Sequence, residues 1–253
     1  MSFYDLAKEQ RQKLVAQIHE DILLAIQTDE FDKVLKYFSD DDTYIRKSAY
    51  LAVGKLYNQH ASFQKDIISI LSHLTGDPDF KIRQTAVNAA GEIGMSDFEP
   101  VEKIFDTCLF DDHHSVRNAV IGSVKKMGAK NPAPVLSWAR KYLHHEDKEV
   151  RREICHGIEL RGRTHPQDIL PMLQELQFDK TARVRRTLVH VIGQISYKKN
   201  CLQTVIHHLN SWENKEVVKE SVAEIIDVHH RYKDFVVLTQ DQAKQLIKSH
   251  LKI

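Results

Sequence analysis

The stretch HEDKEVRREICHGIEL, residues 145–160, decides the fold because its pattern recurs along the chain. In this copy Val150 precedes a cation, Arg151, and a polar turn residue, His145, stands six positions before that cation. The same aliphatic–cation pair occurs at Ile45-Arg46, Ile82-Arg83, Val116-Arg117, Val184-Arg185 and Val218-Lys219. The spacings between successive cations are 37, 34, 34, 34 and 34 residues. A period of this length predicts a protein built from structural repeats.

Each repeat is predicted to be a pair of helices joined by a short polar turn. Apolar residues after each cation fall at helical spacing, as Ala86, Val87, Ala90 and Ile93 do. Another amphipathic run, such as FQKDIISILSHL, precedes each turn. A lone helix pair cannot bury its apolar faces, so successive pairs must stack. We expect the turn residue and the cation to form a ladder of ion pairs between repeats, with the turn residues Asp40, Asp77, Asp111, His145, Asp179 and Glu213.

This pattern of an acid followed six residues later by a cation resembles HEAT repeats. The expected fold is all-α: an α-solenoid of about six HEAT-like two-helix repeats with flanking N- and C-terminal helices. The repeats cover about residues 30–230, and helices at about 4–27 and from Thr239 flank them. Thr239 and Gln242 fit a capping box at the start of the last helix. No stretch rich in Pro, Gly or Ser reads as a linker, so we expect a single domain over 1–253.

Composition narrows the class of protein. The chain has 253 residues and a formal net charge of +1, which says nothing by itself about partners. Cys108, Cys155 and Cys201 are odd in number and lie in apolar helical contexts, so we expect free buried thiols in a reducing compartment. The first residues contain no apolar run of the length expected of a signal peptide, and no run of eighteen apolar residues occurs in the sequence. We expect a cytoplasmic monomer without a membrane span or a cofactor.

The neutral average hides an uneven distribution of charge. Residues 1–137 carry 16 Lys and Arg against 20 Asp and Glu, whereas residues 138–199 carry 13 against 8. Arg152 and Arg186 are extra cations one repeat apart, beside the ladder cations. On stacked helices they would lie roughly 8–10 Å apart, a separation that suits two phosphates of one strand. The alternative is a solvated helix face with local ion pairs to Glu149 and Glu153.

The segment 134–212 is similar to the HEAT-like DNA alkylation repair family, the alkylpurine DNA glycosylases. The similarity rests on Trp138-Ala139, Val150-Arg151-Arg152 with Gly157, Arg161-x-Arg163, Val184-Arg185-Arg186, the QIS at 194–196 and Trp212. The resemblance implies DNA held in a basic concave groove. It also implies a carboxylate that stabilises the sugar cation as an alkylated base departs.

The positions at which that family carries its acids hold other residues here. Arg117 and Asn118 stand where one branch of the family has its catalytic Asp, and His156 stands where another branch has an acid. A second acid would fall at Gln194, and an aromatic residue of the family corresponds to His190. We therefore expect DNA binding without catalysis. Should the protein be an active glycosylase, the candidate catalytic residues are Glu153, Glu159 and His156.

The basic repeats at about 134–199 are the expected binding site for duplex or branched DNA. Phosphate contacts add salt-dependent affinity that is independent of sequence. The candidate nucleic-acid-binding residues are Arg152, Arg186, Lys148, Arg161, Arg163, Arg183, Lys198, Lys199 and His190. A scaffold that binds a protein partner remains open, because HEAT arrays commonly serve that role and need no basic groove.

The fifteen histidines raise the question of a metal site. Ligands on one helix need a spacing of three or four residues, or they must converge from facing helices. His156–Glu159 and Cys155–Glu159 have such a spacing. The histidine doublets, however, fall at different offsets from the ladder cation and form no column along the repeats. We expect no metal site.

Overall fold

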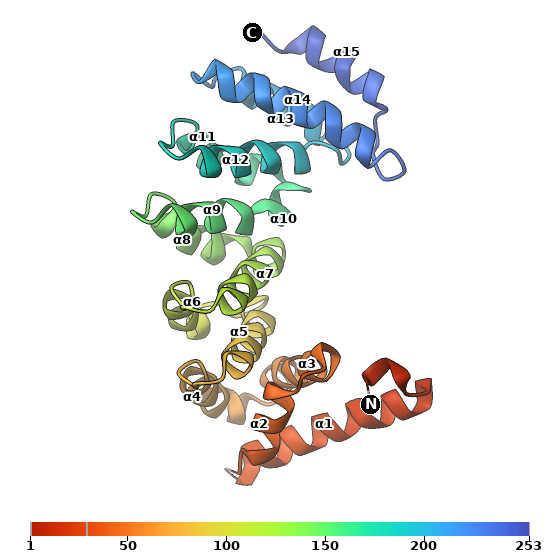
Figure 1. The fold of residues 1–253 in the computed structure, drawn as a ribbon, viewed down its shortest axis with the longest axis vertical. Helices are drawn as coiled ribbons and strands as arrows, with labels where there is room; N and C mark the ends of the chain where they lie inside the picture. The colour runs from red at the N-terminus through yellow and green to blue at the C-terminus, as the bar shows by residue number, and fades with distance from the viewer. Residues whose placement is uncertain (1, 29, 253) are drawn as a thin grey trace. The chain divides into compact units, whose positions relative to one another are not determined.

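The computed structural model describes residues 2–28 and 30–252, and all regular secondary structure in these ranges is helical. The helices pair in the order expected of HEAT-like repeats (Figure 1). They pack into two compact units, the first ending at Asn131 and the second starting at Pro132. The all-α, HEAT-like fold class is thus confirmed.

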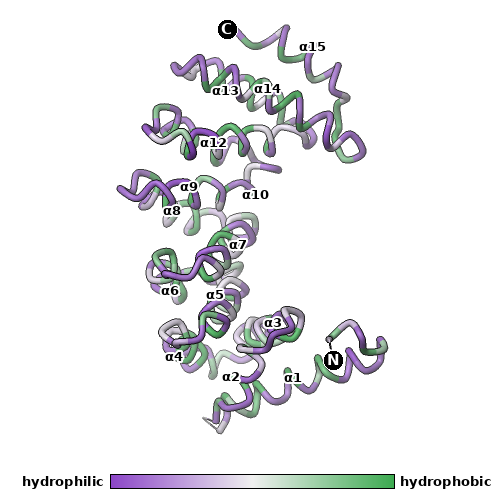
Figure 2. Tube along the Cα trace, in the orientation of Figure 1, coloured by the Kyte–Doolittle hydropathy of each residue, from purple (hydrophilic) through white to green (hydrophobic). Residues whose placement is uncertain are grey.

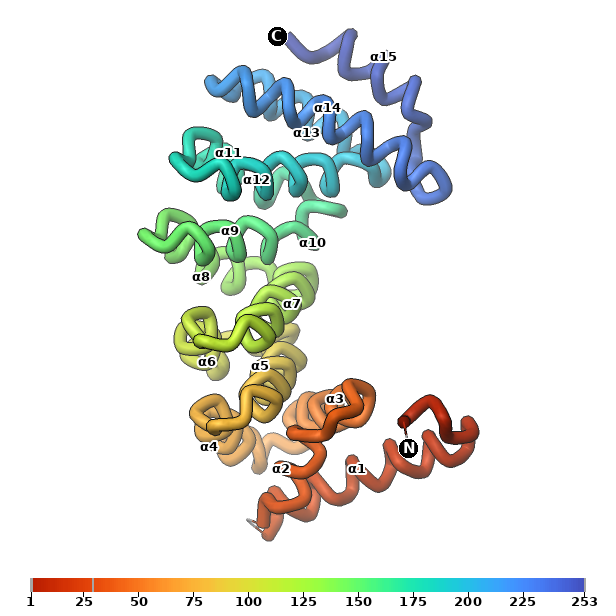
Figure 3. The backbone as a smooth tube through the Cα atoms, viewed as in Figure 1, coloured from red at the N-terminus to blue at the C-terminus, as the bar shows by residue number. Residues whose placement is uncertain are grey.

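The first unit consists of a leading helix followed by three helix pairs. A short 3-10 turn at Phe3–Asp5 precedes α1. The bounds are α1 Lys8–Thr28, α2 Asp32–Ser39, α3 Thr43–Gln59, α4 Gln64–Leu74, α5 Phe80–Gly94, α6 Glu102–Cys108 and α7 His114–Lys130. Helices α1, α3, α5 and α7 pack against one another in this order, so the second helix of each pair stacks on the next (Figure 3).

The second unit repeats the arrangement and ends with a flanking helix. Its bounds are α8 Pro132–Tyr142, α9 Lys148–Gly157, α10 Glu159–Gly162, α11 Leu170–Glu175, α12 Ala182–Gln194, α13 Cys201–Leu209, α14 Lys215–Arg231 and α15 Gln240–His250. Helix α9 packs on α12, and α12 packs on α14. The capping box predicted at Thr239 and Gln242 is present at the start of α15.

The cores of both units are apolar and close-packed. Green apolar and purple polar residues alternate along helices such as α1 and α14 in Figure 2, as the helical spacing predicts. Trp138 and Trp212 are buried, and Phe38 and Phe105 are fully buried in the first unit. All three cysteines are free and buried, as expected from the sequence. Among the described residues no helix is both long and apolar enough to cross a bilayer.

The ladder cations make two kinds of contact. Arg83 forms an ion pair with Asp111 at 2.7 Å, and Arg151 forms one with Asp179 at 2.6 Å, so each links its repeat to the next. These two pairs show the predicted contact at two of the junctions between repeats. A second contact, which the sequence did not predict, lies within the repeat: the guanidinium donates to the backbone carbonyl six residues earlier, as Arg83 does to Asp77. Arg46, Arg117, Arg151 and Arg185 do the same.

The turn residues fix the starts of the second helices. The side chain of Asp77 accepts a hydrogen bond from the backbone of Asp79, and Asp79 in turn caps α5 by accepting from the backbone N–H of Lys81. Such caps satisfy backbone donors that the first turn of a helix leaves without partners. Asp42 and Asp147 cap α3 and α9 in the same way.

Candidate functional site

A hollow of about 320 Å³ lies between α9 and α12, inside the region expected to bind DNA. Arg152 and His156 are one turn apart on α9 and line one side. The other side consists of residues spaced by three, four and seven positions on α12, namely Arg183, Arg186, Thr187 and His190. We call these six residues the α9–α12 hollow. Helical spacing thus gathers four of the nine candidate nucleic-acid-binding residues.

Acidic side chains neutralise part of this positive charge. Glu149 accepts from Arg152 at 2.8 Å and from Arg183 at 3.0 Å. Arg152 also contacts Glu153 at 3.4 Å. Arg186 is exposed, and no ion pair of Arg186 is found within 2–28 and 30–252. The local ion pairs proposed as the alternative to phosphate binding are therefore present for Arg152. Arg183 and Arg186 are both exposed, and Arg186 is the arginine of the hollow that no described acid pairs with.

The remaining candidate cations lie outside the hollow. Lys148 is the first residue of α9. Arg161 on α10 pairs with Asp168 at 2.6 Å, and Arg163 donates to Glu159 at 2.9 Å and to Gln194 at 3.1 Å. Lys198 and Lys199 are exposed in the loop between α12 and α13, where Lys198 lies over the ring of Tyr197. Their role in DNA binding stays a prediction.

The candidate catalytic carboxylates are buried. The exposed fraction is 4% for Glu153 and 1% for Glu159. Arg152 contacts Glu153, Arg163 holds one oxygen of Glu159, and His156 Nε2 lies 3.1 Å from the other oxygen. A carboxylate that stabilises a departing base must reach the bound sugar, and both carboxylates are engaged with protein groups. Their catalytic role also stays a prediction.

A larger groove lies in the first unit, between α1 and α3. Its volume is about 860 Å³ and its exposed lining is mainly apolar. Residues of one face of α1 and one face of α3 line it, together with the turn before α1. The lining consists of Phe3, Tyr4, Lys8, Arg11, Gln12, Val15, Ala16, His19, Glu20, Tyr44, Lys47, Ser48, Leu51, Ala52 and Lys55. We call this site the α1–α3 groove.

Exposed apolar side chains concentrate in this groove. Tyr4 is 57% exposed, and Val15, Tyr44 and Leu51 are each 40–42% exposed. Nine large apolar side chains are this exposed among the described residues, and these four line a single groove. Scattered exposed apolar residues are normal on a folded protein, whereas a cluster rimmed by polar residues marks an interaction surface.

Asp42 holds the aromatic end of the groove in place. Its carboxylate accepts hydrogen bonds from the backbone N–H of Phe3 at 2.6 Å and of Tyr44 at 2.8 Å. The same residue therefore caps α3 and anchors the turn before α1. Tyr4 then packs edge-on against Tyr44 with ring centroids 4.4 Å apart, and Phe3 stacks on Tyr44 at 6.0 Å.

The rim of the groove is basic. Lys8, Arg11, Lys47 and Lys55 stand against one acid, Glu20. Burial lowers the pKa of His19, and the nearby charge of Lys55 lowers this pKa further. The lowered pKa favours the neutral form of His19, and the four cations carry the positive charge of the rim. This local positive charge contrasts with the net negative charge of residues 1–137 as a whole.

The sequence analysis missed this groove. The repeat pattern assigns Ala49, Val53 and Leu56 to the core side of α3, and the structure buries all three. Tyr44, Leu51 and the interleaved Lys47 and Lys55 follow a second helical stripe on α3 that the repeat does not require. An apolar stripe on a helix whose core face is already accounted for is the signal that could have revealed the groove.

Comparisons with known proteins agree with a helical-repeat chain. Residues 23–119 match the sequence profile of the family described as non-SMC mitotic condensation complex subunit 1. No curated protein matches the chain.

Solved structures similar in fold include YibA of E. coli, at 17% identity and a TM-score of 0.49, covering 96% of this chain and 86% of that one. The archaeal HEAT-like repeats protein from Thermococcus onnurineus has 13% identity and a TM-score of 0.41, with 96% and 98% covered. A chain of the Pds5–Scc1 complex has 11% identity and a TM-score of 0.49, with 97% and 42% covered. The present chain thus spans less than half of that last structure.

Proposed function

We propose that this protein is a HEAT-repeat scaffold that binds a protein partner through the α1–α3 groove. The observation that carries the proposal is the gathering of Tyr4, Val15, Tyr44 and Leu51, all exposed, in one groove. An apolar surface left open to water by a folded unit gains free energy when a partner covers it, at about 25 cal/mol per Å².

The charge of the rim defines the partner's chemistry. Four cations surround the apolar floor and one acid lies among them. Complementarity favours a segment that carries aromatic or aliphatic side chains together with Asp and Glu. Arg11 already lies over the ring of Tyr4, 5.1 Å from its centroid, so it is oriented along the aromatic wall. We infer that the partner segment is acidic and amphipathic.

The similarity of residues 23–119 to a subunit family of a mitotic condensation complex supports this proposal. That family is named for a subunit of a multiprotein assembly, and the matched region includes α3 but only the end of α1, after the α1 residues that line the groove. This similarity therefore supports a role in the assembly of a protein complex.

Selection from a peptide display library tests the scaffold proposal. We expect the wild-type chain to enrich peptides in which Asp or Glu alternates with Phe, Leu or Ile. Leu51→Glu places a charge on the apolar floor and should abolish this enrichment. Leu24→Glu is the matched control, because Leu24 is exposed on α1, which forms one wall of the groove, but lies outside the groove itself. Enrichment of basic or neutral peptides, or enrichment that survives Leu51→Glu, contradicts the proposal.

A second candidate function is binding of the DNA backbone by the α9–α12 hollow. The observation that favours it is the presence of three arginines around one hollow, with Arg186 exposed. The relation to alkylpurine DNA glycosylases stays part of this second candidate. Because Glu149 neutralises charge on Arg152 and Arg183, we expect weak, salt-dependent binding.

Binding and base-release measurements on duplex and branched DNA, each methylated and unmethylated, test this second candidate. Arg152→Ala combined with Arg186→Ala should weaken binding and flatten its dependence on salt by about one unit per lost phosphate contact. Lys219→Ala, which removes an exposed ladder cation outside the hollow, is the control. Unchanged binding in the double variant contradicts the assignment. Release of a methylated base would show that the protein is a glycosylase.

A further inference from the structure

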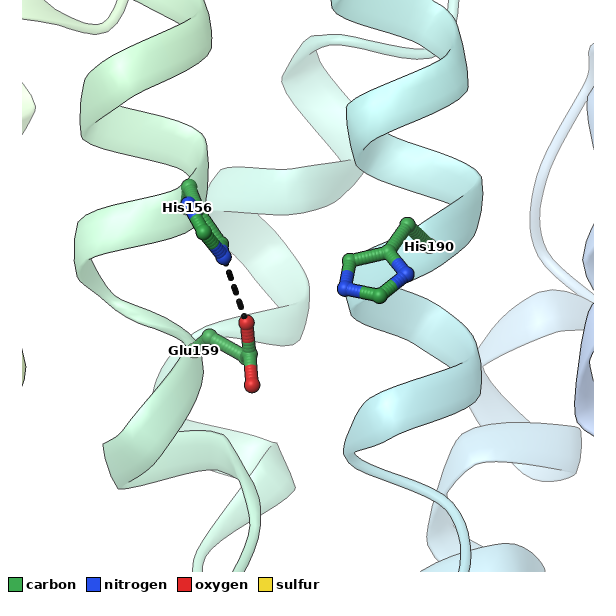
Figure 4. A group of neighbouring side chains, drawn as sticks. All are labelled: His156, Glu159 and His190. Carbon is green, nitrogen blue, oxygen red and sulfur yellow. Dashed lines mark ion pairs between the residues drawn. The ribbon is translucent and has the colours of Figure 1, made fainter. Parts of the chain in front are cut away.

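Three side chains that can bind a metal lie close together, and two of them, His156 and His190, line the α9–α12 hollow. His156 and Glu159 come from the end of α9 and the start of α10, and His190 comes from α12 (Figure 4). One nitrogen of each histidine and one oxygen of Glu159 all lie within 4.8 Å of one another. His156 Nε2 is 3.1 Å from Glu159 Oε2.

Glu159 is held so that one oxygen faces the histidines. Arg163 Nε donates to Glu159 Oε1 at 2.9 Å, and Arg163 in turn donates to Gln194 at 3.1 Å. The carboxylate is 1% exposed, so its orientation is set by these partners and not by water. The other oxygen, Oε2, faces the two imidazole rings and pairs with His156, as Figure 4 shows. Hydrogen-bonded support of this kind orients metal ligands in known sites.

His190 has a carboxylate on its other side. Its Nδ1 lies 3.6 Å from Glu224 Oε1, and Arg231 holds Glu224 at 2.6 Å. In Figure 4 the second ring nitrogen of His190, Nε2, points toward Glu159. At 3.6 Å the contact between His190 and Glu224 is at an ion-pair distance, longer than a hydrogen bond. A carboxylate that accepts a hydrogen bond from Nδ1 fixes the tautomer with a free Nε2, and Glu224 is positioned to take this role once a metal draws His190 into place.

We propose that His156, Glu159 and His190 bind a divalent transition-metal ion, with Zn²⁺ as the fitting ion. Two imidazoles and a carboxylate suit Zn²⁺, and ligands around a tetrahedral ion with bonds of about 2.0–2.1 Å lie roughly 3.3 Å apart. His156 and Glu159 already have about this separation. His190 is 42% exposed at its side chain and can close the remaining distance by a small rotation.

An ion held by these three ligands would have its fourth position on the side of the hollow, which His156 and His190 line. Three protein ligands and one open position are typical of sites that bind water or an anionic ligand at the metal. Arg186 and Arg152 line the same hollow, so an anion on the metal would also meet a guanidinium. We infer that the loaded site binds a small oxyanion or a phosphate group at this position.

Neighbouring charged side chains determine the affinity for Zn²⁺ that we expect. Arg163 offsets part of the charge of Glu159, while Glu149 offsets Arg152 and Arg183. The site should therefore bind Zn²⁺ less tightly than a closed structural site does, and more tightly than a lone histidine. The proposal is independent of the α1–α3 groove, which lies in the other unit.

Titration of the full chain with Zn²⁺, and with Co²⁺ as a spectroscopic probe, tests the site. We expect one strong site per chain and, for Co²⁺, visible absorption typical of tetrahedral coordination. His190→Ala and Glu159→Gln each remove a ligand and should weaken this site at least about tenfold, because losing a supporting partner alone weakens metal binding by about 10- to 100-fold. Glu224→Gln changes only a supporting partner of His190 and should weaken metal binding by about 10- to 100-fold.

His144→Ala is the matched control. His144 contacts Glu175 at 2.8 Å in the same unit, and it is not part of a three-ligand group among the described residues. This variant should retain the strong site and its Co²⁺ spectrum. Because the His190 side chain is partly exposed, we expect His190→Ala to fold as the wild type does, and circular dichroism can check this. A spectrum or an affinity that His190→Ala leaves unchanged overturns the proposal, as does the absence of any strong site.

Discussion

The carboxylate of Asp42 accepts a hydrogen bond of 2.6 Å from the backbone N–H of Phe3, and this bond ties the turn before α1 to the start of α3. The same carboxylate caps α3 at Tyr44. One side chain therefore builds the aromatic end of the α1–α3 groove and the first turn of one of its walls. The groove depends on a local contact that acidification can break.

Asp42→Ala should loosen this end of the groove. It removes the cap of α3, which is worth about 1 kcal/mol, as well as the bond to Phe3. We expect faster proteolysis after Arg11 and altered tyrosine fluorescence, with the rest of the chain folded. Asp42→Asn keeps an acceptor and should have a smaller effect. Equal behaviour of Asp42→Ala and wild type would contradict the role given to Asp42.

The same contact should depend on pH. The bond from the Phe3 backbone lowers the pKa of Asp42, and the bond from Tyr44 lowers it further, whereas burial opposes them. A group with a lowered folded-state pKa contributes stability above its ordinary pKa and loses it as the pH falls through the folded value. The tyrosine signal should therefore be constant at neutral pH and change below the ordinary range of Asp. Asp42→Asn should abolish this change.

Asp179→Ala should strongly destabilise the second unit. The Arg151–Asp179 pair links two repeats and its side chains are only 6% and 5% exposed. Removing one partner leaves a buried charge, which costs about 3–5 kcal/mol. Glu175→Ala breaks the more exposed Arg140–Glu175 pair and should cost about 0–1 kcal/mol. Urea unfolding of both variants measures the difference. Equal losses in the free energy of unfolding would show that the buried ladder pair stabilises the fold no more than the exposed pair does.

Acid should weaken the same link. Burial alone would raise the pKa of Asp179, but hydrogen bonds from Arg151 and from the backbone of Thr181 outweigh it, and the net pKa is lowered. The contribution of Asp179 to stability is thus full above the ordinary Asp pKa and is lost as the pH falls through the folded value. Asp179→Ala should flatten the pH dependence of unfolding in this acidic range, which urea titrations at several pH values can measure.

Gly91→Ala and Gly122→Ala should have opposite effects, although both lie in helices of the same stack. A Cβ at Gly91 would stand 2.6 Å from Ser123 Cβ on α7, whereas one at Gly122 would meet no atom within 4 Å. We expect a loss of about 1–3 kcal/mol from overpacking at Gly91. At Gly122 the better helix propensity of Ala should add about 0.5–1 kcal/mol. Thermal unfolding distinguishes the two, and destabilisation by Gly122→Ala would contradict the packing described for α7.

The repeat fold could be predicted because its signals are local. Val150-Arg151 and its counterparts recur at a fixed interval, and the capping box at Thr239 depends on four consecutive residues. The link from Arg151 to Asp179 followed from stacking successive pairs. The bond from each ladder arginine to its own turn carbonyl did not follow, because it depends on how the turn backbone is oriented.

The sites could be predicted only in part. Arg152, Arg186 and His190 share one hollow because helices one repeat apart stack in register. That Glu149 would engage two arginines at once was not visible from counts of charge. The spacing of His156 and Glu159 was visible, but their proximity to His190 depends on how α9 and α12 pack. The α1–α3 groove joins residues about forty positions apart with no shared motif.

The basic rim of the α1–α3 groove should govern how fast an acidic partner associates. Lys47→Glu combined with Lys55→Glu reverses two of its four cations. For an acidic peptide selected on the wild type, we expect a lower association rate and a weaker dependence on salt, since steering acts on encounter more than on dissociation. Lys13→Glu combined with Lys36→Glu makes the same change in net charge at exposed positions outside the groove. Stopped-flow fluorescence at several salt concentrations separates the two pairs. Equal slowing by both would mean that overall charge, not the rim, attracts the partner.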